Sequence, residues 1–376
     1  MQQPGLDLLE FQKKFRTEKA CLKQLLQLRW PQGFRCPRCQ HDRAYFHSTR
    51  HLYECQACSY QASLTAGTIF HKTRTPLRKW FWMIFLMGRQ KSGASMLSLQ
   101  RLLKIRDYKT VWTMGHKIRK AMADRDAAYQ LAGLLEMDDT YFGATKPGKR
   151  GRGAAGKAKV VVAVETPDDK PRFAAMRRVP QVGRQDIKGM ALECLVAEAT
   201  VRTDGWQSYR VLKELSHQHE PVVTGSGKNA VHLFPWVHTL IANVKGNIRG
   251  VYHGVSEKHL PRYLAEFCYR FNRRFWEDQM FNRMVTACVG TQNHYFSGAK
   301  AIIEKDNYRA GDCNCGDFLK FLVSSAERLD VDITPQQREQ QEDKDIAPVN
   351  AHLLVGIFQD IYFDQDDQGE KEKKEQ

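Results

Sequence analysis

The stretch LLEMDDTYFG at residues 134–143 decides the fold of this chain. Its residues alternate as in a β-strand, where successive side chains point to opposite faces. Asp139 then shares one face with Leu135 and Met137, and Asp138 shares the other face with Glu136. We therefore expect a strand that carries acidic side chains in the middle of a folded domain.

The segments after this strand predict an α/β domain. We expect apolar strands at residues 160–165 and 173–179, a helix at 185–196, a short strand at 200–204, and helices from about residue 207 and over 236–248. Three strands, a helix, a strand and then helices is the element order of a ribonuclease-H-like fold. That fold holds carboxylates on a central strand and at the end of its neighbour, the places of Asp138 and Asp204.

Asp138 and Asp204 are therefore the candidate catalytic carboxylates. Two such groups can bind Mg²⁺ or Mn²⁺ ions, which activate a water or a 3′-hydroxyl and stabilise the leaving oxygen at phosphorus. A plain turn residue is the alternative for Asp204, because it precedes Gly205. Asp139 ranks second to Asp138, because strand alternation places it on the face of Met137.

Two CxxC pairs predict a structural zinc site in the N-terminal part of the chain. Cys36 and Cys39 are followed by Cys55 and Cys58. Each pair brings two thiolates to one turn, and two pairs complete a tetrahedral Zn²⁺ site. Free or redox-active cysteines are the alternative. Three nearby histidines are not needed as ligands and are expected at the surface or on DNA: His41, His47 and His51.

Residues 73–130 predict a helix-turn-helix segment. One amphipathic helix is expected after Ser95, a turn at residues 105–107, and a second helix over 108–122. Polar positions of the second helix are largely basic and suit a major groove; they are Lys109, Thr110, Thr113, His116, Lys117, Arg119 and Lys120. We take Lys109, Lys117 and Lys120 as candidate DNA contacts. The alternative is an ordinary helical hairpin.

Charge is distributed unevenly along the chain. Residues 1–130 contain 24 Lys and Arg against 8 Asp and Glu, and this excess of +16 equals the net charge of the whole chain. Such a basic region suggests a polyanionic partner. The longest apolar run, residues 80–87, is too short to span a bilayer, and the N-terminus lacks a signal sequence. We expect a soluble cytoplasmic protein, associated with the nucleoid, with no membrane partner.

The basic loop at residues 145–159 contains an accidental match to a nucleotide-binding motif. GRGAAGK at residues 151–157 fits the GxGxxG pattern. A dinucleotide-binding loop leaves a strand and begins a helix, whereas these glycines precede a strand. We therefore expect a loop near a DNA backbone here and not a nucleotide cofactor.

Four groups of residues together resemble bacterial insertion-sequence transposases of the zinc-ribbon-bearing DDE type, the ISXO2-like group, over residues 30–290. They are the CxxC pairs with LTAGTIF at 64–70, EMDDTYFG at 136–143 with GRGAAG at 151–156, TDGWQSY at 203–209, and NVK at 243–245 with RGVYH at 249–253 and FCYRFNRR at 267–274. The resemblance implies that Asp138 and Asp204 are the first and second catalytic carboxylates. It also implies that Lys245 contacts DNA, and Arg249 is a further candidate contact.

The third catalytic carboxylate of that family is missing here. No Asp or Glu lies in the helix before Lys245. Related subgroups have Asn, which points to Asn243. Helical geometry points instead to His238, which lies seven residues before Lys245. On an unbroken helix, residues seven apart lie within roughly 20° of each other, so His238 would share the face of Lys245. Gly246 could end the helix early, and neither residue need bind metal, so both alternatives stay open.

The sequence thus predicts an α/β protein in four parts: an N-terminal helix and zinc ribbon (1–72), a helix-turn-helix segment (73–130), a ribonuclease-H-like transposase domain (131–310) and an extension with an acidic tail (311–376). We expect it to bind double-stranded DNA, both its element's terminal inverted repeats and target DNA, as a homo-oligomer. It would then catalyse cleavage and strand transfer with Mg²⁺ or Mn²⁺. The alternatives are a non-catalytic DNA-binding regulator and a nuclease that does not join strands.

Overall fold

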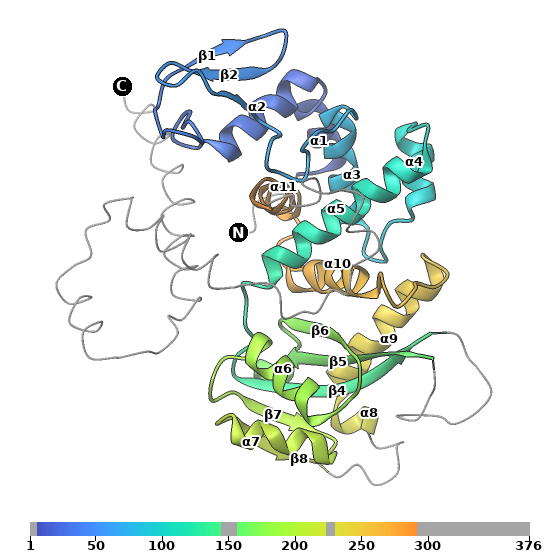
Figure 1. Cartoon of the computed structure of the whole chain (residues 1–376). Coiled ribbons are helices and arrows are strands. Elements are labelled where there is room, and N and C mark those ends of the chain that lie inside the picture. The colour runs from blue at the N-terminus through green and yellow to red at the C-terminus, as the bar shows by residue number, and fades with distance from the viewer. Residues whose placement is uncertain (1–5, 144–155, 223–229, 292–376) are drawn as a thin grey trace, which may run out of the picture. The chain divides into compact units, whose positions relative to one another are not determined.

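A computed structural model describes residues 6–143, 156–222 and 230–291 of the chain. The N-terminal half begins with two helices and a small antiparallel sheet, followed by three further helices (Figure 1). These elements are α1 (Leu8–Lys14), α2 (Glu18–Arg29), β1 (Ala44–His47), β2 (Leu52–Cys55), β3 (Gln61–Ser63), α3 (Leu77–Arg89), α4 (Met96–Leu103) and α5 (Tyr108–Asp126). The expected helix, turn and helix are confirmed as α4 and α5.

The second half contains a five-stranded mixed sheet with helices on both faces. Its elements are β4 (Leu134–Phe142), β5 (Ala158–Glu165), β6 (Ala174–Val179), α6 (Arg184–Cys194), β7 (Thr200–Thr203), α7 (Val211–Glu214), β8 (Gln218–Pro221), α8 (Ala230–Leu233), α9 (Pro235–Gly250), α10 (Leu260–Asn272) and α11 (Met280–Gly290). The strand order is β6-β5-β4-β7-β8. β5 is antiparallel to β4 and β6, and β7 is parallel to β4 and β8. This topology confirms the ribonuclease-H-like fold.

Successive side chains of β4 point to opposite faces of the sheet and pack into two different apolar cores. Leu135 and Met137 pack with residues of α6, α7 and β7 on one face of the sheet. Phe142, with Val160 and Val162 of β5, packs with residues of α9 and α10 on the other face. The even-numbered side chains of β4 therefore point toward α9, as the sequence pattern predicted.

The strand β8 was not predicted. Its sequence, QHEP, has no apolar alternation, because it is the edge strand and pairs on one side only. Side chains link it to β7: Arg202 Nε donates to Glu220 Oε2 at 2.8 Å. Pro221 at its end removes a backbone donor from the open edge of the sheet.

Helices from both ends of the described chain share one large apolar core. Phe11 of α1 and Phe81 of α3 pack against Phe281 of α11, with ring centroids 5.0 and 5.6 Å apart. α10 lies between α5 and β6 (Figure 1). α10 thus connects the helical segment to the sheet, and α11 packs against α2, α3 and α5, although both helices follow the sheet in sequence.

Two expectations concern segments outside the described residues. The GxGxxG pattern lies almost wholly in residues 144–155, and the C-terminal extension lies in residues 292–376. Within the described residues, no helix is long and apolar enough to span a membrane.

Candidate active site and metal centres

Asp138 lies in the middle of β4, on the face that points toward α9. It is half-buried, and its Oδ1 accepts a hydrogen bond of 2.8 Å from the backbone N–H of Asp139. Asp139 belongs to the alternation set of Leu135 and Met137, which pack against the opposite core. The strand therefore presents Asp138, and not its neighbour, to the α9 side of the sheet.

Asp204 follows the last residue of β7, the strand beside β4. The parallel register pairs Leu134 with Thr200 and Glu136 with Arg202. Continuing this register by two residues brings Asp204 level with Asp138. Asp204 Oδ1 accepts from the backbone N–H of Trp206 at 3.0 Å, which holds the carboxylate in a local turn.

The turn after β7 is supported from the edge of the sheet. Gly205 adopts a φ of +78°, a conformation that glycine takes at least cost. Its N–H donates to Thr203 Oγ1 at 3.2 Å, and the same hydroxyl lies 2.9 Å from His219 Nε2 on β8. Burial lowers the pKa of His219, so its neutral ring can accept the Thr203 hydroxyl proton. The sequence alone does not reveal the contact between His219 and Thr203, because the pattern of β8 does not predict a strand.

Glu136 fixes the start of α9 on the sheet. Its Oε2 accepts from the backbone N–H groups of Trp236 and Val237 at 3.0 and 2.8 Å. These are two of the donors that every helix leaves unpaired at its N-terminus, and Phe234, the N-cap residue, has no side chain able to pair them. The carboxylate of β4 therefore replaces a local cap and sets the position of α9 relative to Asp138.

His238, in the first turn of α9, is the residue of that helix beside Asp138. Its Nδ1 lies 3.8 Å from Asp138 Oδ2. Burial, followed by the charge of Lys245, lowers the pKa of His238, which favours the neutral ring. α9 continues unbroken past Gly246 to Gly250, and Asn243 is exposed on it. Asn243 is five residues from His238, about 140° around the helix.

Lys245 lies two turns along α9 from His238. Its Nζ is 5.7 Å from the centre of the Phe142 ring. Burial lowers its pKa, and the charge of Asp138 opposes that shift. The cation is therefore close enough to the carboxylate to interact with it electrostatically.

The chemistry of these side chains fits a divalent metal. Carboxylate oxygens suit Mg²⁺ and Mn²⁺, and an imidazole is better tolerated by Mn²⁺. Among the described residues, only the four ribbon cysteines form a group of three or more His, Cys, Asp or Glu whose ligand atoms all lie within 4.8 Å. Asp138, Asp204 and His238 are thus grouped more loosely than the ribbon ligands.

The four ribbon cysteines have the geometry of a tetrahedral zinc site. Cys36 Sγ lies 3.6 Å from Cys58 Sγ, and Cys39 Sγ lies 3.5 Å from Cys55 Sγ. Zn–S bonds of about 2.3 Å place tetrahedral sulfurs about 3.8 Å apart. The cluster and the zinc-ribbon fold support a structural zinc. None of the nearby histidines joins the group; His47 instead lies 2.9 Å from Glu54.

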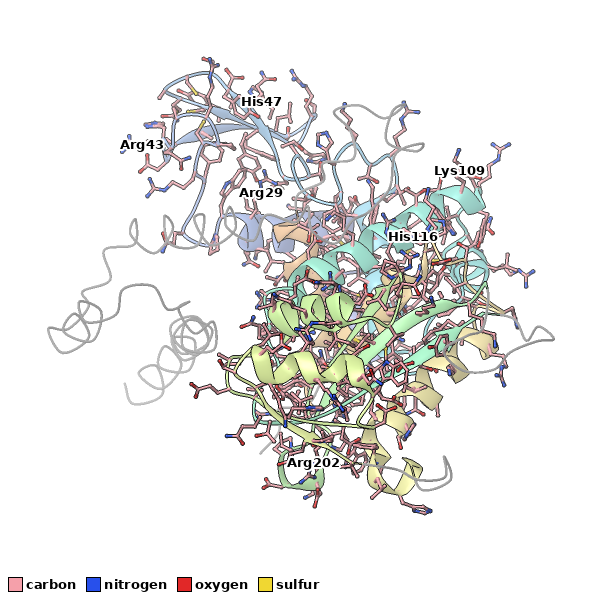
Figure 2. All side chains as sticks on the ribbon, turned by 60° about the horizontal axis from the view of Figure 1, so that its bottom comes forward. Arg29, Arg43, His47, Lys109, His116 and Arg202 are labelled. Carbon is pink, nitrogen blue, oxygen red and sulfur yellow. The ribbon has the colours of Figure 1, made fainter. Side chains whose placement is uncertain are left out.

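The candidate DNA contacts on α5 differ in exposure. Lys109 is exposed at the start of the helix (Figure 2), whereas Lys117 is half-buried. Lys120 is half-buried too, and its Nζ lies 2.7 Å from Asp124 Oδ2. His116 and Arg119, which we had counted among the polar positions of the DNA-binding face, are 3% and 0% exposed. That part of the expectation is wrong, because α10 covers this side of α5.

Two family models match the chain. Residues 130–272 match the ISXO2-like transposase domain, and residues 16–61 match the transposase zinc-ribbon domain. An uncharacterized protein in transposable element ISH50 of Halobacterium salinarum is 26% identical in an alignment of 283 residues that covers 68% of this chain and 91% of that protein.

Solved structures give weaker likenesses. The catalytic core domain of BIV integrase is 14% identical with a TM-score of 0.24, and the match covers 36% of this chain and 82% of that one. A pre-cleavage Mos1 transpososome is 10% identical with a TM-score of 0.23, covering 56% and 78%. The ribonuclease-H-like fold is seen in the strand order β6-β5-β4-β7-β8 and in the match to the transposase domain family.

Proposed function

Because this chain belongs, through residues 16–61 and 130–272, to the ISXO2-like transposases, we propose that it binds the ends of its own mobile element and cleaves and joins DNA there. The observation that carries the proposal is the pairing of Asp138 with Asp204. Asp204 follows directly after β7, and the parallel register of β7 with β4, continued by two residues, brings it level with Asp138; His238 of α9 is 3.8 Å from Asp138. This is a donor set suited to phosphoryl transfer with a divalent metal.

In this proposal, Asp138 and Asp204 hold the metal and His238 completes the site. When bound, Mg²⁺ or Mn²⁺ supplies activation of the attacking water or 3′-hydroxyl and stabilisation of the leaving oxygen at phosphorus. Neutral His238 can offer a nitrogen lone pair, a weaker ligand than the family's third carboxylate. We therefore assign the third position to His238 and not to the exposed Asn243.

The remaining side chains act on the DNA. Lys245 and Arg249 follow His238 along α9 and offer charge to backbone phosphates beside the reacting one. Lys109 and the basic N-terminal part would hold the duplex through phosphate contacts, with strong salt dependence. Pairing of two element ends by a homo-oligomer belongs to the same proposal.

A DNA cleavage and joining assay separates this function from its alternatives. The full-length protein is mixed with labelled DNA that carries an end of its element and flanking sequence, with Mn²⁺, Mg²⁺ or neither. We expect cleaved and joined products only with metal, and neither product from Asp204→Asn, although that variant still binds the DNA. Cleavage without joining would indicate a nuclease, and binding without cleavage would indicate a regulator.

A further inference from the structure

A cavity of about 620 Å³ lies further along β4 and α9 from the proposed active site, and of its lining residues only Lys245 and Arg249 have a role in the function proposed above. It is formed where the ends of β4 and β5 meet the second half of α9 and the start of α10. Its lining includes Phe142, Lys157, Lys245, Ile248 and Arg249. Its volume falls in the range of sites for small organic groups, about 300–1,000 Å³.

One side of the cavity is cationic. Lys245 and Arg249 are four residues apart on α9 and so lie on one face of the helix. Lys157, at the start of β5, adds a third cation, and its charge is one of the causes that lower the pKa of Lys245 after burial. Three cations around one hollow repel one another, so an anion placed there would relieve an unfavourable arrangement.

The other side is aromatic and aliphatic. Phe142 is 7% exposed, and the Lys245 ammonium lies 5.7 Å from its ring centre. Ile248, Val255 and Leu260 complete an apolar wall. A ligand that fills this cavity therefore combines a flat or apolar body with a negative charge, which is the chemistry of a nucleotide.

β4 and α9 both lead from the carboxylates to the cavity. Phe142 is four residues beyond Asp138 on β4, about 13 Å along the strand. Lys245 is seven residues beyond His238 on α9, about 10 Å along the helix. Since His238 is next to Asp138 and Lys245 is next to Phe142, the strand and the helix run side by side from the site to the cavity.

We propose that this cavity binds a single unpaired nucleotide of the DNA strand, close to the phosphate that reacts, with its base against Phe142 and its phosphate on Lys245 and Arg249. The proposal rests on the proposed function, because it takes DNA as the substrate. A paired base cannot enter a cavity of this kind, since its faces are stacked and its edge is bonded to its partner. The protein would therefore favour DNA that is open or easily opened at this position.

Photo-cross-linking tests this placement without requiring catalysis. The probe is a 12-nucleotide single strand with one 5-iodo-2′-deoxyuridine, compared with the same strand in a blunt duplex, and full-length protein is irradiated without divalent metal. We expect a cross-link in the peptide that contains Tyr141 and Phe142, identified by mass spectrometry. Its yield should be at least about fivefold higher from the single strand, which corresponds to about 1 kcal/mol of stacking.

Two variants decide whether the cavity itself is responsible. Ile248→Trp fills the cavity and should lower that cross-link at least about fivefold, while binding to the duplex is unchanged. Arg210→Glu, a substitution at an exposed residue outside the cavity lining, is the control and should lower neither the cross-link nor duplex binding. Cross-links only in the zinc ribbon, or an undiminished cross-link in Ile248→Trp, would overturn the proposal. If element-end DNA is cleaved but this cross-link is absent, nucleotide binding in the cavity is rejected and the proposed function stands. If the cross-link forms but no DNA is cleaved, the proposed function is rejected and nucleotide binding in the cavity stands.

Discussion

The active site proposed above takes His238, and not Asn243, as its third ligand. His238 lies 3.8 Å from Asp138, whereas Asn243 is exposed on a different side of α9. We predict that His238→Ala lowers the rate of Mn²⁺-dependent cleavage by at least about tenfold, or about 1.4 kcal/mol in the barrier. Asn243→Ala, the matched control on the same helix, should stay within about twofold. A loss of activity in Asn243→Ala with normal activity in His238→Ala would reverse the assignment.

The sequence predicted some site residues and missed others for a physical reason. Asp138 and Asp204 could be chosen because strand alternation and strand order are local patterns. Helix geometry placed His238 on the same face as Lys245 once the helix was assumed unbroken, and the structure then shows His238 beside Asp138. Glu136 and His219 could not be recognised, because their roles depend on contacts with α9 and β7 that no local pattern records.

At the scale of elements, the position of α9 depends on the Glu136 carboxylate. We predict that Glu136→Ala lowers the free energy of unfolding by about 1–3 kcal/mol, because it leaves the N–H groups of Trp236 and Val237 without their acceptor. Glu136→Gln keeps an acceptor oxygen and should cost less. Urea unfolding measures both. The control is Glu220→Gln, which removes an exposed ion pair with Arg202 and should cost at most about 1 kcal/mol. An equal cost for Glu136→Ala and Glu220→Gln would contradict the anchoring role.

The helices α5 and α10 are joined by a buried ion pair. Arg119 Nε lies 2.6 Å from Glu266 Oε2, with 0% and 1% of the side chains exposed. Burial alone would raise the pKa of Glu266, but the guanidinium groups of Arg119 and Arg270 outweigh it and hold the pKa below 4.5. Folding therefore favours the charged carboxylate, and its contribution to stability is present above pH 4.5 and lost as the pH falls through the lowered pKa.

We predict that Glu266→Gln destabilises the protein by about 3–5 kcal/mol at pH 7, because Arg119 keeps a buried charge without its partner. The difference in unfolding free energy between wild type and variant should shrink as the pH falls below 4.5. Urea titrations at pH 7 and at successively lower pH measure it. A difference that stays constant down to the acid transition would show that Glu266 is not charged in the folded protein.

Most elements were predictable, and the exceptions share a cause. β4, β5 and α9 have clear periodicities and were found close to their observed bounds. β8 is a short polar edge strand that depends on β7, and its pattern resembles a loop. Burial of His116 and Arg119 in α5 depends on α10, which lies more than a hundred residues later in the chain.

At the scale of the whole molecule, the charge distribution predicted a basic N-terminal part but not its packing. Ring contacts join Phe11 and Phe281, 270 residues apart. A fragment that ends at residue 130 would lose α10 and α11 and expose the apolar core they cover. DNA binding is therefore best measured on the full chain.

Zinc removal should affect one part of the molecule. The ribbon has its own small apolar cluster around Trp30, Ala62 and Leu64, too little to fold without a metal. We predict that Cys58→Ser abolishes zinc content and hydrogen-exchange protection in residues 36–63 and leaves β4–β7 protected. Cys194→Ser, at a half-buried cysteine outside the ribbon, should keep its zinc. Full zinc content in Cys58→Ser, or equal loss in both variants, would contradict the four-cysteine site.

In the proposed function, Asp138, together with Asp204, supports metal-dependent cleavage of DNA. The most direct measurement is the Mn²⁺-dependent cleavage rate of element-end DNA by Asp138→Asn and Asp139→Asn, two substitutions of equal size and charge on adjacent residues. Because β4 presents only Asp138 to His238, we predict that Asp138→Asn loses at least about a thousandfold, about 4 kcal/mol in the barrier, while Asp139→Asn stays within about tenfold of wild type. Wild-type cleavage by Asp138→Asn, or the larger loss in Asp139→Asn, would contradict the account.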